Sequence, residues 1–486
     1  MAPAARGRFA NSALWVALEM LGGSVFSSLG LIVIAGLIGP ADLGLAAIAL
    51  ALAQIMNFLP ETLFHDAIVQ RRRLTALDIG SAFWSAMMLA IGLSGGAALA
   101  AGWIARWYGQ PGLSSLLLAL AVLPIASAVV SIQTARLRRA MRFRLLTLRA
   151  TVSRALATAA GLVLALMGCG AWAVVAQYGI GIGALALLHA PGLNWRRLRR
   201  FSLSRARQIG HFGLKCSSLY FLDGMRGRLY FMLLGQYLPL GVLGQVNLAW
   251  RIADSLTAVT TVGIVRLYLP LFARAQGNAR RLRAYLHESS FLATALLAPL
   301  FVGLALSSAD LVGWLGAAKW QGMGDLLPWL CAGAIVAIIR TPSWTAILAV
   351  GQPLLTASVL AGILVATLGA VVIVSPETGM QAVICWTAPL LLSLPASLAV
   401  AGRPIGATLR EQVAALLPAV MCAGTIAAAM IGARVIAEPK AGGERLVYEL
   451  AAGAVAYLLS LWWVRRVVRE RRGAMGVGAV PAVPAG

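Results

Sequence analysis

The sequence predicts an all-α integral membrane protein with about fourteen transmembrane helices. The first observation behind this class is composition. Of the residues, 60% are hydrophobic and only 12% are charged, with a mean hydropathy of +0.85, whereas a soluble chain carries about 25% charged residues. The second is a series of long apolar segments, and the third is a regular alternation in the charge of the connections between them.

The apolar segments are long enough to cross a bilayer, which takes about 20 residues of helix. The expected spans are residues 12–38, 43–60, 80–104, 114–135, 150–168, 171–190, 211–236, 241–271, 289–307, 326–347, 354–375, 378–400, 412–432 and 446–464. The first run follows Arg6 and Arg8, as in a signal peptide. It is too long for the core of such a peptide and lacks a clear cleavage site, so we expect an uncleaved first span.

Basic residues concentrate in every second connection. With the N-terminus, these connections hold 28 of the 40 Lys and Arg residues, and the other set holds five. The basic segments are 71–73, 136–149, 196–207, 274–283, 403–410 and 465–472. Loops rich in Lys and Arg stay in the cytoplasm, so we expect both termini there. The net charge of +24 then reflects membrane topology, and we expect no nucleic-acid partner.

Two turns look like copies of one another, Gly36–Gly44 after the first span and Gly235–Gly244 after the seventh. Their offset of six spans predicts a parallel repeat of two six-helix lobes, residues 1–205 and 206–405. Residues 406–472 are then two additional transmembrane helices. Residues 473–486, mostly Gly, Ala, Val and Pro, are expected to form a disordered cytoplasmic tail.

Ionisable residues inside spans are the strongest functional signal, because each charge near the middle costs roughly 2.5–3.5 kcal/mol to insert. Seven of the ten are basic and three are acidic. Arg154 and Lys215 lie close enough to the cytoplasmic edge to reach water. The remaining residues are Arg226, Arg228, Arg251, Arg266, Arg340, Glu19, Asp223 and Asp254. Glu449 lies at the outer end of the last span and is set apart from them.

Spacing indicates which of these charges pair locally. Asp223 and Arg226 are three residues apart on one helical face, as are Arg251 and Asp254. Arg228 is two residues from Arg226, so it faces elsewhere and has no local partner. One interpretation is that all these charges form ion pairs that hold the helices together. The other is that the arginines line a wet cationic cavity, since guanidinium groups suit phosphate.

The acidic residues allow two roles as well. Glu19, the acid of the first span, either couples transport to protons or serves as a counter-ion to a cavity arginine. Asp223 and Asp254 have the same two possible roles.

Motifs for catalysis are missing. The chain has no Walker-type nucleotide site, no His-Glu-x-x-His and no Gly-x-Ser-x-Gly. Its five cysteines have no metal-ligand or disulfide spacing. The longest outer segment, 308–325, is too short for an extracytoplasmic catalytic domain. We expect no enzyme activity, no catalytic residues, no metal and no cofactor.

Several N-terminal segments resemble Wzx-type polysaccharide repeat-unit flippases of the multidrug/oligosaccharidyl-lipid/polysaccharide exporter superfamily. These segments are Gly39-Pro-Ala-Asp-Leu-Gly44, Ala67-Ile-Val-Gln-Arg-Arg-Arg-Leu-Thr75, Ser81-Ala-Phe-Trp84 and Arg136-Leu-Arg-Arg-Ala-Met-Arg-Phe143. In relatives, the segment before Ala67 often carries small, glycine-rich residues. Here that segment is Glu61-Thr-Leu-Phe-His-Asp66.

The resemblance implies two six-helix lobes around a central cavity, with alternating access. It also implies a bacterial inner-membrane location and a polyprenyl diphosphate-linked oligosaccharide as cargo. Membrane lipid, a polysaccharide polymerase and export proteins are the other partners that it suggests. The cationic cavity of the family corresponds here to the in-span arginines, as the site of the cargo diphosphate.

Two alternatives remain open. A membrane polymerase or ligase of lipid-linked sugars requires a substantial outer loop with catalytic groups, which the sequence lacks. A drug or lipid II exporter of the same fold is the second. A cationic drug prefers acidic cavity residues, but lipid II shares the diphosphate, so charge does not separate it from an oligosaccharide.

Overall fold

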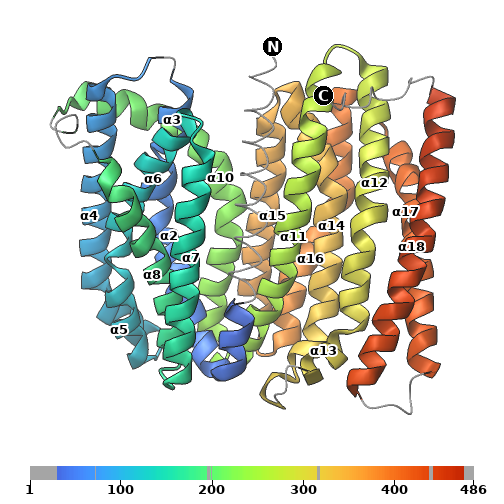
Figure 1. Ribbon diagram of the computed structural model, residues 1–486, viewed down its shortest axis with the longest axis horizontal. Coiled ribbons are helices and arrows are strands. Elements are labelled where there is room, and N and C mark those ends of the chain that lie inside the picture. Colours follow the sequence, from blue (N-terminus) through green and yellow to red (C-terminus); the bar gives the residue numbers. More distant parts are fainter. Residues whose placement is uncertain are drawn as a thin grey trace. The chain divides into compact units, whose positions relative to one another are not determined.

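The computed structural model describes residues 30–71, 73–193, 198, 200–314, 318–436 and 442–475. Its regular elements in these ranges are all helices (Figure 1). The predicted all-α class is therefore confirmed.

The helices match the predicted spans closely. Twelve helices among the described residues are long and apolar enough to cross a membrane, and they coincide with twelve of the fourteen predicted spans. The predicted span 12–38 lies mostly outside the described residues, of which 30–37 are helical. The predicted span 211–236 lies in α10 (Leu203–Tyr237), a continuous helix of 35 residues.

The chain packs as two compact units, residues 1–248 with 368–379 and residues 249–367 with 380–486. The predicted division into six-helix lobes at residue 205 stays a prediction. The first unit contains α2 (Pro40–Thr62), α3 (His65–Gln70), α4 (Ala76–Trp107), α5 (Pro111–Leu120), α6 (Leu123–Arg139), α7 (Phe143–Leu166), α8 (Ala171–His189) and α10. Two further helices, α11 (Leu240–Arg274) and α15 (Pro353–Val374), contribute residues to both units.

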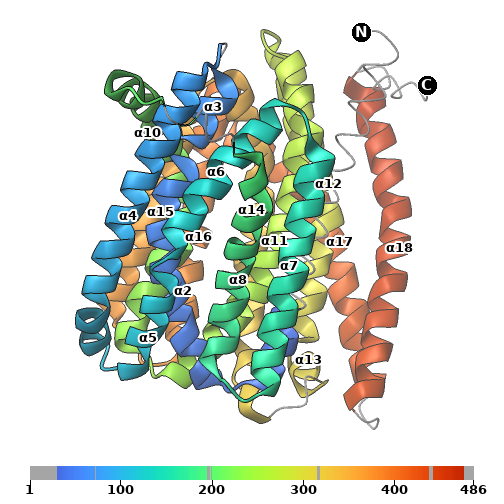
Figure 2. The same cartoon turned by 60° about the vertical axis from the view of Figure 1, so that its left-hand side comes forward.

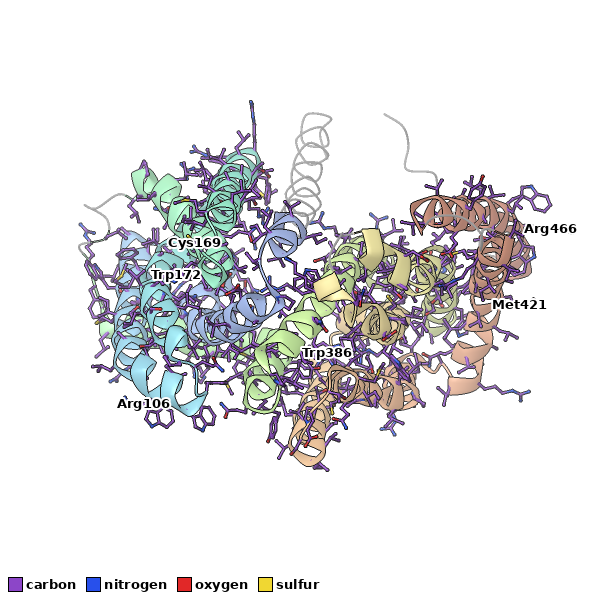
Figure 3. The ribbon with its side chains drawn as sticks, turned by 90° about the horizontal axis from the view of Figure 1, so that it is seen from below. Arg106, Cys169, Trp172, Trp386, Met421 and Arg466 are labelled. Carbon is purple, nitrogen blue, oxygen red and sulfur yellow. The ribbon has the colours of Figure 1, made fainter. Side chains whose placement is uncertain are left out.

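Helix α2 lies at the centre of the first unit, against α6, α8 and α10 (Figures 1 and 2). More than half of its 23 residues are buried, many of them alanines, and small side chains allow helix backbones to approach closely in a membrane. Helix α4 packs on α5, α6 and α10, and α7 on α8. The end of α4 at Arg106 and the α7–α8 turn at Cys169 and Trp172 lie at one end of this unit (Figure 3).

The predicted span 114–135 is divided into two helices. Helix α5 ends at Leu120 and α6 begins at Leu123. Pro124 explains the break, because it has no N–H to donate to the carbonyl of Leu120 one turn earlier. The two helices together still form one candidate span, Pro111–Arg139.

The opposite end of the first unit is held by Asp78, which is 1% exposed. Its carboxylate accepts hydrogen bonds from the backbone and hydroxyl of Thr75 in a capping box that begins α4. Arg71 Nη1 lies 3.4 Å and Arg205 Nη1 3.9 Å from Asp78 Oδ1. Because Arg205 is on α10, this buried acid connects the start of α4 with the start of α10.

The second unit is built on α12 (Ala279–Leu306), which packs against α14 (Met323–Val350), α17 (Leu409–Ile436) and α18 (Gly442–Met475). Its other helices are α13 (Ser308–Trp314) and α16 (Gly379–Gly402). Phe291 and Ala295 of α12 form a core with Ala419 and Cys422 of α17 and Val464 of α18. The helices α17 and α18, predicted as additions to the lobes, are thus packed on α12, and they lie side by side in Figures 1 and 2.

Candidate functional site

The candidate site lies on α10, which the first unit holds firmly. Tyr108, after α4, donates a hydrogen bond from Oη to the carbonyl of Met232, 2.8 Å away. Gly213 faces the backbone of Leu63 so closely that a β-carbon would collide with the Leu63 carbonyl. A β-carbon at Gly235 would lie only 2.8 Å from the side chain of Ile48 on α2. These contacts fix the rotation of α10 and therefore the direction of its polar side chains.

Arg228 is the arginine whose position the structure defines best. Its Nε donates to Gln54 Oε1 of α2 at 3.2 Å, and its Nη1 donates to the carbonyl of Gly224 at 2.8 Å. The side chain is half-buried, and these two are its hydrogen bonds among the residues that the structure describes. The guanidinium is therefore held through two of its nitrogens, Nε and Nη1.

Gly224 makes this geometry possible. A β-carbon at this position would lie 2.8 Å from Arg228 Nη1. Since that is too close for a carbon and a nitrogen without a bond, any larger residue displaces the guanidinium. The glycine, one turn before Arg228, provides the space in which the side chain turns back on its own helix.

Helix α2 carries a polar face that includes Gln54, the partner of Arg228. Gln54, Asn57 and Glu61 are spaced i, i+3 and i+7, so they share one side of α2. Ser127 Oγ donates to Asn57 Oδ1 at 3.3 Å, and Ser131 Oγ to the carbonyl of Glu61 at 2.6 Å. Helix α6 thus packs against part of this face.

Glu61 is an acidic residue about two turns after Gln54 on α2. Its side chain is exposed, and it lies within electrostatic range of Arg228. The two groups form no ion pair within 4.0 Å. In the first unit the structure thus joins one cation, Arg228, to one amide, Gln54.

The other predicted residues of the first unit are less defined. Arg226 is half-buried on α10, two residues before Arg228. Asp223 also lies on α10, but its side chain is outside the described part, as is all of Glu19. The predicted pairing of Asp223 with Arg226 therefore stays a prediction.

The remaining predicted residues belong to the second unit. Arg251 is half-buried on α11, and Asp254 and Arg266 are exposed on the same helix. Arg340 of α14 is only 6% exposed, and its Cζ lies 4.3 Å from the centre of the Trp344 ring. In this conformation the Arg340 charge rests on an indole face, a cation–π contact that stabilises buried guanidinium groups.

The structure adds hydrogen-bond partners for Arg228 that the sequence analysis did not consider. The expectation concerned a charged neighbour, whereas the observed partners are the Gly224 carbonyl on its own helix and Gln54, 174 positions earlier in the chain. Sequence reasoning missed Gln54 and Glu61 as site residues. The signal that identifies them was present, because an i, i+3, i+7 polar pattern in an apolar span marks a helix face turned away from lipid.

Comparisons with known proteins place the chain in a family. A family model described as polysaccharide biosynthesis protein matches residues 33–325, which is more than half of the 486 residues. The succinoglycan biosynthesis transport protein ExoT of Rhizobium meliloti (strain 1021) is 24% identical over 300 residues, 60% of this chain. The lipopolysaccharide biosynthesis protein WzxC of Escherichia coli (strain K12) is 22% identical over 346 residues, 69% of each chain. The alignment with ExoT spans 60% of the length of that protein.

Two solved structures share the fold. The lipid II flippase MurJ in an inward closed conformation aligns with a TM-score of 0.75 over 94% of this chain and 100% of that one, at 10% identity. An inward-facing multidrug resistance transporter of the MATE family aligns with a TM-score of 0.53 over 82% of this chain and 94% of that one, at 17% identity. At such identities the likeness concerns the fold alone.

The sequence-based resemblance is thereby confirmed. The four segments that carry it, between Gly39 and Phe143, all lie inside the region that the family model matches. The candidate spans and the shared fold agree with a multi-pass membrane protein. The chain belongs to the polysaccharide biosynthesis protein family.

Proposed function

We propose that this protein is a flippase that moves a polyprenyl diphosphate-linked oligosaccharide from the cytoplasmic to the outer leaflet of a bacterial inner membrane. The family, and relatives named for succinoglycan transport and lipopolysaccharide biosynthesis, support a carrier of polysaccharide precursors. The cargo head group is large, polar and anionic. It needs a polar path across the bilayer. Apolar side chains on the twelve candidate spans would not provide that path by themselves, so the charged residues within the predicted spans are its expected lining.

The observation that carries the proposal is the geometry of Arg228. The Arg228 guanidinium, within the predicted span 211–236, is held by Gln54 and Gly224 through Nε and Nη1. Arginine keeps its charge in any environment and donates strong charge-assisted hydrogen bonds to phosphate oxygens. We propose Arg228 as the principal diphosphate contact and Arg226, Arg251 and Arg266 as further cavity residues.

The remaining charged residues take supporting roles in this proposal. Arg340 rests against Trp344, and we assign it to the packing of α14 rather than to first contact with cargo. Glu19, Asp223 and Asp254 act as counter-ions or in ion coupling. Alternating access exposes the site first to the cytoplasm, where the basic loops attract the anionic cargo, and then to the outside. A polysaccharide polymerase then receives the released unit.

Transport in vesicles tests the proposal. Purified protein in proteoliposomes should translocate a fluorescent polyprenyl diphosphate-linked oligosaccharide, detected by an added membrane-impermeant quencher. Loss of one charge-assisted bond predicts that Arg228→Ala lowers the initial rate about tenfold or more. Arg106→Ala, an exposed arginine at the end of α4 (Figure 3), should leave the rate unchanged. Normal transport by a variant with Arg226, Arg228 and Arg251 all replaced by Ala would contradict the site.

A further inference from the structure

Residues 200–208, a basic segment that leads into α10, lie along the start of α4. The backbone N–H of Ser202 donates to Ser81 Oγ at 2.9 Å. A β-carbon at Gly80 would collide with the carbonyl of Arg200, so the two backbones are in direct contact there. These contacts hold the segment in one place on the first unit and fix the surface that its side chains form.

Two arginines on this surface share a single buried acid. Nη1 of Arg71 lies 3.4 Å and Nη1 of Arg205 lies 3.9 Å from Oδ1 of Asp78. Arg71 also donates from Nη2 to Oε1 of Gln208, on α10, at 3.0 Å. The two arginine side chains remain 23% and 47% exposed. One carboxylate balances one of the two charges, so the pair presents a net positive charge at the surface.

The surrounding connections contain too few acids to supply the missing negative charge. Residues 61–78, 136–149 and 194–211 together contain 15 arginines and three acids. The second of these connections lies at the same end of the unit, because Arg139 donates to the carbonyl of Val69, in α3, at 3.2 Å. The charge of this end therefore favours an anionic partner.

Exposed apolar side chains beside these arginines indicate the class of partner. Phe201 is 43% and Leu203 is 57% exposed, and the exposed Arg205 and Arg207 follow in the first two turns of α10. This mixture suits the boundary of a membrane, where apolar groups enter among acyl chains and basic groups stay level with the lipid phosphates. The segment directly precedes the predicted span 211–236, which places it at the depth of the head groups. An acidic protein or a nucleic acid would leave the apolar side chains in water.

We propose that Arg71, Arg205 and Arg207 bind the phosphate group of an anionic phospholipid, while Phe201 and Leu203 contact its acyl chains. The lipid belongs to the leaflet on the side of the basic connections, which is the predicted cytoplasmic side. Guanidinium groups donate charge-assisted hydrogen bonds to phosphate oxygens. Because Arg71 follows α3 and Arg205 lies on α10, a phosphate between them joins these two helices. The inference goes beyond the proposed function, since it does not involve the cargo.

Native mass spectrometry of the full-length protein in detergent tests the inference. The added lipid is phosphatidylglycerol or phosphatidylcholine with identical acyl chains. The natural protein should bind its first phosphatidylglycerol more tightly than its first phosphatidylcholine. Arg205→Ala should weaken the binding of phosphatidylglycerol about fivefold, the effect of one basic group near an anionic lipid surface, and should leave that of phosphatidylcholine unchanged. Arg205→Lys should retain most of the affinity, because it keeps the charge.

Arg106→Ala is the matched control. Arg106 is an exposed arginine at the other end of α4, between the exposed Trp103 and Trp107, so it combines charge and apolar surface in a similar way. This variant should bind phosphatidylglycerol as the natural protein does. Leu203→Ser should weaken the binding of phosphatidylglycerol, because it removes an acyl-chain contact and no charge. Thermal unfolding establishes that each variant is folded before binding is compared.

Unchanged binding of phosphatidylglycerol by Arg205→Ala would overturn the inference, as would an equal loss in Arg106→Ala. Two further probes identify the source of the phosphate. Inorganic phosphate should not displace bound phosphatidylglycerol, and displacement would replace the lipid site by a site for free phosphate. Loss of undecaprenyl diphosphate binding by Arg205→Ala, with phosphatidylglycerol binding intact, would assign the surface to the cargo instead. None of these measurements depends on transport, so they leave the proposed function to its own test.

Discussion

Gly44 and Gly244 face each other at a crossing of α2 and α11 where neither residue has room for a β-carbon. A β-carbon on Gly44 would collide with the carbonyl of Leu240 and lie 3.1 Å from the nitrogen of Gly244. One on Gly244 would collide with the carbonyl of Pro40 and lie 3.1 Å from the nitrogen of Gly44. The contact is reciprocal, and it lies within the first unit. The two turns that the sequence pairs as copies therefore meet at matching positions.

Gly44→Ala and Gly244→Ala should each destabilise the protein by about 1–3 kcal/mol, because an added methyl group in a close-packed contact forces backbones apart. The measurement is thermal unfolding in detergent. Gly263→Ala on α11 is the control. It has open space around its β-carbon position, so it should stabilise by about 0.5–1 kcal/mol through helix propensity. Equal effects of the three substitutions would show that the crossing is not tight.

Gly224→Ala should weaken diphosphate binding while leaving the fold intact. The new β-carbon would meet only the end of a flexible side chain, Arg228 Nη1, so the guanidinium moves and the helix does not. We expect undecaprenyl diphosphate to bind about tenfold more weakly in a calorimetric titration of the full-length protein in nanodiscs. This is the loss of affinity expected when one charge-assisted hydrogen bond is displaced. Thermal stability should change by less than about 1 kcal/mol. In combination with Arg228→Ala, Gly224→Ala should cause no further loss of affinity. An additional loss would show that Gly224 affects binding by a route other than Arg228.

The contact of α17 and α18 with α12 depends on a buried acid. Glu449 of α18 is 1% exposed, with Arg434 Nε at 3.6 Å and Ser307 Oγ at 3.5 Å from its carboxylate oxygens. Removing the cation leaves this charge in an apolar place, so Arg434→Ala should lower stability by about 1–3 kcal/mol. Adding Glu449→Gln should recover part of this loss, since a neutral amide costs less to bury than a carboxylate.

Thermal unfolding measures these stabilities as well, with Arg410→Ala as the control. Arg410 is an exposed arginine in the first turn of α17, so its removal should change stability by less than about 0.5 kcal/mol. A single variant Arg434→Ala as stable as the natural protein would show that the acid is supported in another way.

The two ends of α7 provide a test of topology. Met141 precedes the helix and is 52% exposed, and Met167 follows it and is 71% exposed. The basic segment 136–149 predicts the Met141 end in the cytoplasm and the Met167 end outside. In a background without natural cysteines, a membrane-impermeant maleimide applied to intact spheroplasts should label Met167→Cys at once. It should label Met141→Cys only after the membrane is permeabilised, and the reverse order would invert the topology.

Much of the fold follows from the sequence because it depends on local properties. A run of about 20 apolar residues must be a helix in a bilayer, where backbone groups have no water to bond with. Twelve of the fourteen predicted spans therefore coincide with observed helices that could cross a membrane. The break between α5 and α6 is also local, since Pro124 causes it. It was missed because hydropathy measures composition and not backbone hydrogen bonding.

The candidate site was predictable only in part. The cost of burying a charge identified Arg228 from the sequence alone, but nothing local to Arg228 points to Gln54 or Glu61 on another helix. Glu449 shows the same limit. Its place at the outer end of a span set it apart from the in-span charges, yet Arg434 of α17 and Ser307 between α12 and α13 lie against it and it is buried.

The sequence by itself determined that this is a helical membrane protein, where its spans lie and which of its residues carry expensive charges. These properties depend on segments of about 20 residues or fewer. Only the tertiary structure decided that Gln54 and Gly224 orient Arg228 and that Gly44 meets Gly244. Such contacts join residues as far as 174 positions apart. They depend on how each helix is rotated and packed against its neighbours, and no single segment encodes that.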